Sequence, residues 1–181
     1  MFSGQGSEYI NMGLDLYNQE PQFKKDIDEG FEYLTSLIGE DIRYVLYPKD
    51  EKERSASEPR IHRFYYTQPV KFIFEYAYSR LLMRWGFKPH AMIGYSFGEY
   101  IVSCLAGVYT MQDALKVLMK RGEILEKAPA GNMISVSLSE SEVIPLLKPG
   151  LFIGGINTDN LCLVSGSAEV VDVFEKELEE K

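Results

Sequence analysis

The sequence predicts an α/β fold in two parts, and two observations support it. An apolar stretch at residues 91–94 runs through a glycine-flanked turn into an apolar helix over residues 99–106. After Pro129 the pattern changes to strand, helix, strand, strand and helix. The 181 residues suffice to bury one real core with a small appendage. We therefore place a first domain at residues 1–130 and a second at residues 131–181.

Composition narrows the class of protein. The net charge of −8 argues against a nucleic-acid or anionic-membrane partner. No apolar run is long enough to span a membrane, and the N-terminal residues do not resemble a signal peptide. Cys104 and Cys162 lie far apart in apolar runs, outside any metal-ligand spacing. We predict buried, reduced thiols, no metal site and a cytoplasmic location.

The first part is predicted to be largely helical. Residues 22–38 form an amphipathic pattern with one apolar face, and residues 42–46 suggest a short helical turn. The charged residues 48–63 are expected to form an exposed, mobile loop, in which His62 is interpreted as a solvated side chain. Residues 67–85 are apolar nearly all round and predict a helix buried between layers, with Thr67 as its N-cap.

The rest of the chain contains one further helical segment, and the sequence pattern then changes to alternating strands and helices. Residues 110–127 predict a helix that Thr110 opens in a capping-box variant. The following pattern is that of a ferredoxin-like split unit without its last strand. Its predicted elements are strands at 132–138, 151–157 and 161–164, and helices at 139–147 and 168–181. We expect the chain to begin inside a strand and to stop one element short.

The turn after residues 91–94 has the nucleophile-elbow pattern Gly-x-Ser-x-Gly. Ser96 stands at the apex of the turn, between Gly94 and Gly98. A side chain at either glycine position would clash with the adjoining strand or helix. The turn lifts the serine hydroxyl clear and points the N–H of Phe97 at an oxyanion formed there. Because short patterns recur by chance, a strand–loop–helix without chemistry is the alternative.

A serine nucleophile needs a base within hydrogen-bond reach. His62 and His90 are the two histidines of the chain, and both precede Ser96. His90 lies at the opposite end of the predicted strand from the serine. The base therefore either follows residue 181 or does not exist.

Five motifs together resemble malonyl-CoA:acyl carrier protein transacylases, and most of all the acyltransferase domains of modular polyketide synthases. The resemblance covers essentially the whole chain. It implies an α/β-hydrolase-like core with three layers and a mostly parallel sheet, plus a ferredoxin-like α+β subdomain, truncated at both ends. The motifs are Phe2-Ser-Gly-Gln-Gly-Ser7, Thr67-Gln-Pro69, Gly94-Tyr-Ser-Phe-Gly-Glu99, Arg121-Gly122 and Asn157 with Leu163-Val-Ser-Gly166.

The resemblance also implies a ping-pong reaction. Ser96 would take an acyl group from a malonyl-type coenzyme A thioester and pass it to the phosphopantetheine thiol of an acyl carrier protein. The chain would bind no cofactor of its own, and neighbouring synthase domains are possible partners. The catalytic histidine of the family lies roughly a hundred residues after the serine. We therefore expect this chain to lack its general base.

The resemblance assigns a role from the acyltransferase family to individual residues of this chain. Ser96 matches the nucleophile, the N–H of Phe97 one oxyanion donor, and Gln5 the glutamine of the glycine-rich loop, whose backbone supplies the second donor. Gln68 matches a glutamine that lines the active site. Arg121, 25 positions after the serine (121 − 96), matches the arginine that grips the free carboxylate of the malonyl group.

Some of these assignments have alternatives. Arg121 could instead form a surface ion pair with Glu123 or Glu126. Asn157, which matches a substrate-binding position, could be a turn residue beside a strand end. Tyr95 stands where the family usually has histidine, which affects the acyl pocket and the identity of the extender unit. The competing functions are a serine hydrolase such as a thioesterase, and an inactive fragment that docks a carrier protein.

Overall fold

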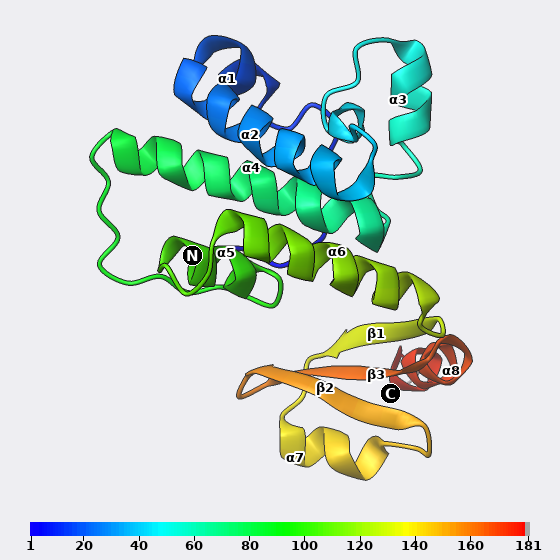
Figure 1. Cartoon of the computed structure of the whole chain (residues 1–181). Coiled ribbons are helices and arrows are strands. Elements are labelled where there is room, and N and C mark those ends of the chain that lie inside the picture. The colour runs from blue at the N-terminus through cyan, green and yellow to red at the C-terminus, as the bar shows by residue number, and fades with distance from the viewer. Residues whose placement is uncertain (180–181) are drawn as a thin grey trace. The chain divides into compact units, whose positions relative to one another are not determined.

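The computed structural model describes residues 1–179. The chain divides into two compact units, Met1–Lys127 and Ala128–Lys181 (Figure 1). Each unit has its own hydrophobic core. The first unit is mainly helical. Its elements are α1 (Leu14–Gln19), α2 (Pro21–Ile38), a 3₁₀ turn (Arg43–Val45), α3 (Glu51–Ser57), α4 (Phe64–Arg84), α5 (Gly98–Leu105) and α6 (Met111–Lys127).

Helix α4 is the centre of the first unit, and α2, α5 and α6 pack against it (Figure 1). Its buried side chains lie on more than one face, which confirms the prediction of a helix between layers. Helix α2 turns its apolar face inward, and Gly30 on that face allows a close approach. A Cβ at Gly30 would lie 2.8 Å from the side chain of Ile73 on α4. The predicted amphipathic helix at 22–38 is thus confirmed.

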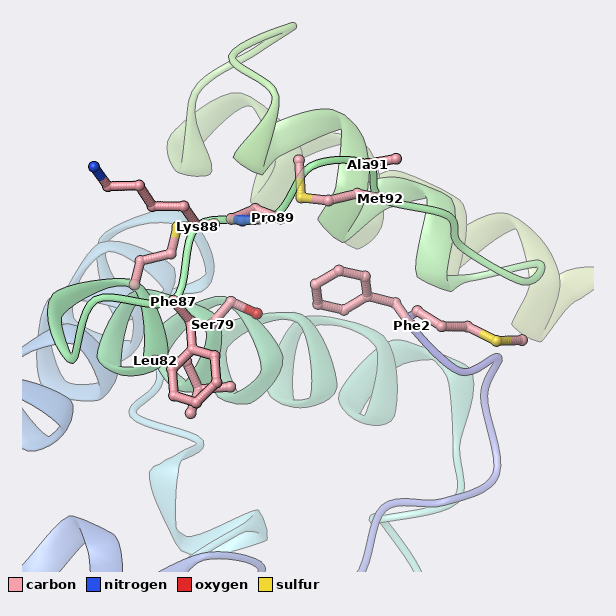
Figure 2. A pocket seen from close by; sticks show the side chains of 10 residues that line it. Phe2, Ser79, Leu82, Phe87, Lys88, Pro89, Ala91 and Met92 are labelled. Carbon is pink, nitrogen blue, oxygen red and sulfur yellow. The ribbon is translucent and has the colours of Figure 1, made fainter.

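One short parallel pairing holds the amino terminus against the segment before Ser96. Phe2 donates its N–H to the carbonyl of Ile93 at 2.9 Å, and Tyr95 donates to the carbonyl of Phe2 at 3.0 Å. Phe2, Met92 and Leu82 are among the residues that line a groove of about 240 Å³. Figure 2 shows their side chains around it. A three-layer, mostly parallel sheet around this pairing stays a prediction.

The prediction that residues 48–63 form an exposed, mobile loop is wrong. Residues 51–57 form α3, whose N-cap Asp50 accepts a hydrogen bond from the N–H of Glu53 at 2.8 Å. The buried Ser57 donates to the carbonyl of Val45 at 2.6 Å, and Ile61 is 2% exposed. Two buried anchors thus hold a segment whose charged residues face the solvent.

A change at Asp50 tests this helix. Asp50→Ala removes the acceptor for an N–H at the start of α3 and should lower the free energy of unfolding by about 1 kcal/mol. Asp50→Asn is the matched control, because asparagine caps helices about as well as aspartate. Urea titration followed by circular dichroism measures both variants. Equal stability of the alanine and asparagine variants would contradict the capping role.

Helix α4 begins at Phe64, three residues before the predicted start, and Arg63 is its N-cap. The prediction that Thr67 caps this helix is therefore wrong. Thr67 lies inside the helix, fully buried, and its hydroxyl donates to Oε1 of Glu8 at 2.6 Å. The threonine links α4 to the amino-terminal loop instead of closing a helix end.

The second unit is a three-stranded antiparallel sheet with helices, and the expected order of strand, helix, strand, strand and helix is confirmed. The strands lie in the order β1-β3-β2, and the ferredoxin-like assignment stays a prediction. Its elements are β1 (Gly131–Val136), α7 (Glu140–Val143), a 3₁₀ turn (Ile144–Leu146), β2 (Leu151–Thr158), β3 (Leu161–Ser167) and α8 (Ala168–Glu179). The last two residues of the predicted terminal helix lie outside the described residues.

Both cysteines are free and buried, as predicted. Burial raises the pKa of the Cys104 thiol to about 11, because the apolar surroundings disfavour the thiolate. Cys104 is therefore protonated at neutral pH. Within residues 1–179, no helix is both long enough and apolar enough to cross a membrane.

Candidate active site

The backbone at Ser96 has the geometry of a nucleophile elbow. Ser96 has a φ of 51°, in the left-handed region that residues other than glycine rarely adopt. A Cβ at Gly94 would lie 2.3 Å from the backbone nitrogen of Glu99, and a Cβ at Gly98 would lie 2.5 Å from the carbonyl oxygen of Phe2. Both glycines are thus required, and the Ser96 side chain is left exposed at the turn.

The start of α5 faces the same turn. Phe97 is the N-cap residue of α5, and its side chain is 1% exposed. Its N–H is among the amides at a helix start that the helix itself cannot pair, so it is available for a developing negative charge. The carboxylate of Glu99 accepts a hydrogen bond from the N–H of Gly94 at 2.8 Å. Glu99 thereby ties the residue that pairs with Phe2 to the first turn of α5.

The glycine-rich loop at residues 3–8 carries Gln5. Gly6 has a φ of 110°, which suits glycine and bends the loop directly after Gln5. Both carboxylate oxygens of Glu8 accept from the N–H of Gly6, at 3.0 and 3.1 Å. The amide of Gly6 is therefore occupied within the loop. This leaves the N–H of Gln5 as the stronger candidate for the second oxyanion donor.

Gln68 on α4 is fully buried, and neither of its amide atoms has a hydrogen-bond partner within the described residues. Buried amide groups are normally paired, because leaving one unpaired costs about 1–3 kcal/mol. Such a group calls for a functional explanation. A glutamine that lines a binding site provides one.

Arg121 on α6 lies beside the helix that follows Ser96. Its guanidinium carbon is 5.8 Å from the ring centroid of Tyr100 on α5. Its Nη1 is buried and has no hydrogen-bond partner among the described residues. The two carboxylates considered for a surface pair are bound elsewhere, since Glu126 pairs with Arg63 and Glu123 pairs with Lys120.

The residue after Arg121 sets the position of α6. A Cβ at Gly122 would lie 2.9 Å from the Cα of Tyr65, so the glycine lets α6 approach the first turn of α4. Arg121 also borders an open, mainly apolar hollow of about 490 Å³ with Tyr100. Close packing of α6 against α4 fixes the position of Arg121, and the open hollow beside its side chain leaves room for a ligand.

Two further predicted site residues, Tyr95 and Asn157, lie in different units of the structure. The ring of Tyr95 is 46% exposed and lies against Gly4 of the glycine-rich loop, where a Cβ would come 3.1 Å from its Cδ1. Asn157 belongs to the second unit and lies at an irregularity in the pairing of β2. Its role in substrate binding stays a prediction.

The two histidines, His62 and His90, lie on either side of α4 in the sequence. His62 lies before α4 and lines a surface hollow with Tyr9 and Arg54. His90 lies in the segment that leads to the Phe2–Gly94 pairing. No hydrogen bond joins either ring to Ser96 among the described residues.

The whole chain, residues 1–181, matches the family described as the acyl transferase domain. The chain belongs to this family. The α/β fold predicted from the sequence is confirmed at this level by the solved structures of the family. Ser96, Gln68 and Arg121 are thus candidate site residues of an acyl transferase domain.

Several relatives of this acyl transferase domain are parts of polyketide synthases. The chain is 30% identical over 180 residues to a phenolphthiocerol/phthiocerol polyketide synthase protein of Mycobacterium tuberculosis, covering 99% of this chain and 12% of that protein. It is 45% identical to the acyl transferase domain of ZmaA, with a TM-score of 0.89, covering 99% of this chain and 42% of that one. It is 31% identical to the acyl transferase domain of SpnD in complex with 2-(pent-4-yn-1-yl)malonyl, with a TM-score of 0.82. That match covers 99% of this chain and 41% of the SpnD chain. The chain thus spans less than half the length of each of these relatives.

The sequence patterns do not indicate the roles of three charged residues near the elbow and the glycine-rich loop. Glu99 binds the N–H of Gly94, Glu8 is a buried carboxylate within the loop, and Lys71 is a buried ammonium on α4 beside it. Glu99 follows the elbow directly, so an acidic residue in the first turn of α5 was a usable signal. Glu8 and Lys71 are 63 positions apart (71 − 8), and no local pattern connects them.

Proposed function

We propose that this acyl transferase domain moves a malonyl-type unit from a coenzyme A or carrier-protein thioester to the phosphopantetheine thiol of an acyl carrier protein. The observation that carries the proposal is the buried Nη1 of Arg121, which has no hydrogen-bond partner within residues 1–179 and lies next to α5, the helix that begins at the Ser96 elbow. The malonyl derivative bound to the related SpnD domain supports the same class of substrate. Polyketide or fatty-acid biosynthesis is the corresponding process.

In the first half-reaction, Oγ of Ser96 attacks the thioester carbonyl carbon. The N–H groups of Phe97 and Gln5 and the positive end of the α5 dipole stabilise the oxyanion. A general base takes up the hydroxyl proton of Ser96, the carbon–sulfur bond breaks, and the base passes the proton to the departing sulfur. Coenzyme A leaves as its thiol, and an acyl ester on Ser96 remains. The second half-reaction reverses these steps, with the phosphopantetheine thiol of the carrier protein as nucleophile.

Arg121 selects the acyl group. A guanidinium pairs with a carboxylate through two parallel hydrogen bonds, and malonyl-type units end in a free carboxylate. A neutral acyl group such as acetyl would leave the partly buried guanidinium unpaired. Gln68, whose amide is also unpartnered, is proposed to hydrogen-bond the same acyl group.

The proton acceptor for Ser96 is proposed to be a histidine outside residues 1–181. The positions of His62 and His90 support this, because neither is hydrogen-bonded to the serine. An activity test therefore needs a protein that extends about a hundred residues beyond this chain, the spacing that the acyltransferase resemblance implies.

Transfer and hydrolysis are separated by one experiment. The extended protein is incubated with malonyl-CoA, with and without a phosphopantetheinylated acyl carrier protein, and the carrier and free malonate are quantified by mass spectrometry. We expect malonyl to accumulate on the carrier and little free malonate without it. Rapid release of malonate without carrier would indicate a thioesterase. Carrier binding without any acylation of Ser96 would indicate a docking module.

A further inference from the structure

A lysine ammonium is buried in the middle of α4, next to the glycine-rich loop. Lys71 is 1% exposed. Its Nζ donates to Oγ of Ser7 at 2.7 Å and to Oγ of Ser3 at 3.3 Å, and pairs with Oε1 of Glu75 at 2.8 Å. Ser3 and Ser7 lie on either side of Gln5. One ammonium thus holds both ends of the loop segment that carries Gln5.

A carboxylate completes the arrangement from the loop side. Glu8 is 4% exposed and lies 3.7 Å from Nζ of Lys71. It accepts from the N–H of Gly6 and from the hydroxyl of Thr67 on α4. The loop is therefore bound to α4 through charged groups and hydroxyl groups.

Stability alone does not explain these buried charges. Withdrawing an ion pair from water is costly, and well-packed apolar side chains of similar size are often as stable or more stable. The neighbours of Lys71 on α4, Val70 and Phe72, are apolar and fully buried. What apolar packing cannot supply is directed hydrogen bonding to loop hydroxyls and to a loop amide.

We propose that Lys71 and Glu8 are positioning residues that fix the glycine-rich loop so that the N–H of Gln5 faces the oxyanion of the acyl transfer reaction. Binding Gly6 N–H to Glu8 sets the bend after Gln5, and binding Ser3 and Ser7 to Lys71 sets the two ends of the loop. A displacement of about 1 Å of such a donor lowers a reaction rate by up to about a hundredfold. This inference rests on the proposed function, because it assigns the loop its oxyanion.

The test compares two cations on the same helix that each pair with a buried carboxylate. Lys71→Met removes the ammonium and keeps an unbranched apolar chain. Arg84→Met is the matched control, because Arg84 also pairs from α4 with a buried carboxylate, Asp26, at 2.6 and 2.9 Å, and none of its hydrogen bonds involves the loop. Both variants are made in the extended protein. Hydrogen exchange of the Gly6 amide and the rate constant of Ser96 acylation at saturating malonyl-CoA are measured in each.

We expect Lys71→Met to speed exchange of the Gly6 amide about tenfold or more and to slow acylation at least tenfold, with little change in KM. Arg84→Met should leave both within about twofold of the wild type. Unchanged Gly6 exchange in Lys71→Met, or equal effects of both variants, would overturn the proposal. Because exchange needs no acyl donor, it decides the positioning role even if the wild type is not acylated, a result that would refute the proposed function instead.

Ser7→Ala keeps the test decisive if Lys71→Met does not fold. It removes one hydroxyl that Lys71 binds and leaves the ammonium paired with Glu75. Ser7 is exposed, so the change leaves the buried core intact. We expect a smaller effect of the same kind, about threefold or more in both Gly6 exchange and acylation. Wild-type values for both quantities would overturn the proposal.

Discussion

Gly98→Ala is expected to lower the free energy of unfolding of the first unit by about 3 kcal/mol and to abolish acylation of Ser96. The new Cβ would lie 2.5 Å from the carbonyl oxygen of Phe2, and that oxygen is backbone and cannot rotate away. Either the Phe2–Gly94 pairing or the elbow has to shift, and overpacking of this kind is strongly destabilising. Chemical denaturation and intact-protein mass spectrometry measure the two effects.

Gly155→Ala in the second unit is the matched control for this substitution. A Cβ at Gly155 would meet only the side chain of Leu163, at an ordinary contact distance of 3.6 Å. We expect it to change stability by less than about 0.5 kcal/mol. If Gly98→Ala were as harmless as Gly155→Ala, the close contact between the elbow and Phe2 would be refuted.

Arg121→Ala is expected to reverse the choice of acyl donor. The rate constant of Ser96 acylation by malonyl-CoA should fall about a hundredfold or more, because a carboxylate would enter a partly buried site without its cation. Acylation by acetyl-CoA should stay unchanged or rise, since acetyl has no carboxylate. Competition between the two donors, read by intact mass, measures the ratio directly.

Lys120→Ala controls for the general loss of a positive charge from α6. Lys120 is next to Arg121, but its side chain is 71% exposed and pairs with Glu123. Removing it should leave the preference for malonyl-CoA within about twofold. If Lys120→Ala weakened malonyl transfer as much as Arg121→Ala, the overall charge of the helix would explain selectivity and the carboxylate contact would not.

The elbow could be predicted from the sequence because its three residues, Gly94, Ser96 and Gly98, form a pattern within five positions. The steric requirement at Gly94 is local, since a Cβ there would meet the backbone of Gly98 and Glu99. The contact that requires glycine at position 98 is with the distant Phe2, and the sequence pattern does not show it. Helices α2 and α6 and the three strands of the second unit are likewise predictable from local periodicity and capping. Apolar residues repeat every two positions in the strands and every three to four positions in the helices.

Other features depend on distant partners and leave no local pattern. Charged positions dominate residues 48–63 and predict a loop, while α3 is held by Ser57 and Ile61. Thr67 resembles an N-cap in sequence because its true partner, Glu8, is 59 positions away. The burial of Lys71 among apolar neighbours becomes visible only when the glycine-rich loop is placed against α4.

Malonyl transfer through Ser96 is tested by identifying which acyl group is attached and at which residue. The extended protein and its Ser96→Ala variant are each incubated with equal malonyl-CoA and acetyl-CoA, digested and analysed by tandem mass spectrometry. We expect one malonyl group on Ser96, little acetyl, and neither in the variant. Acylation that persists in Ser96→Ala, or equal loading of acetyl and malonyl, would contradict it.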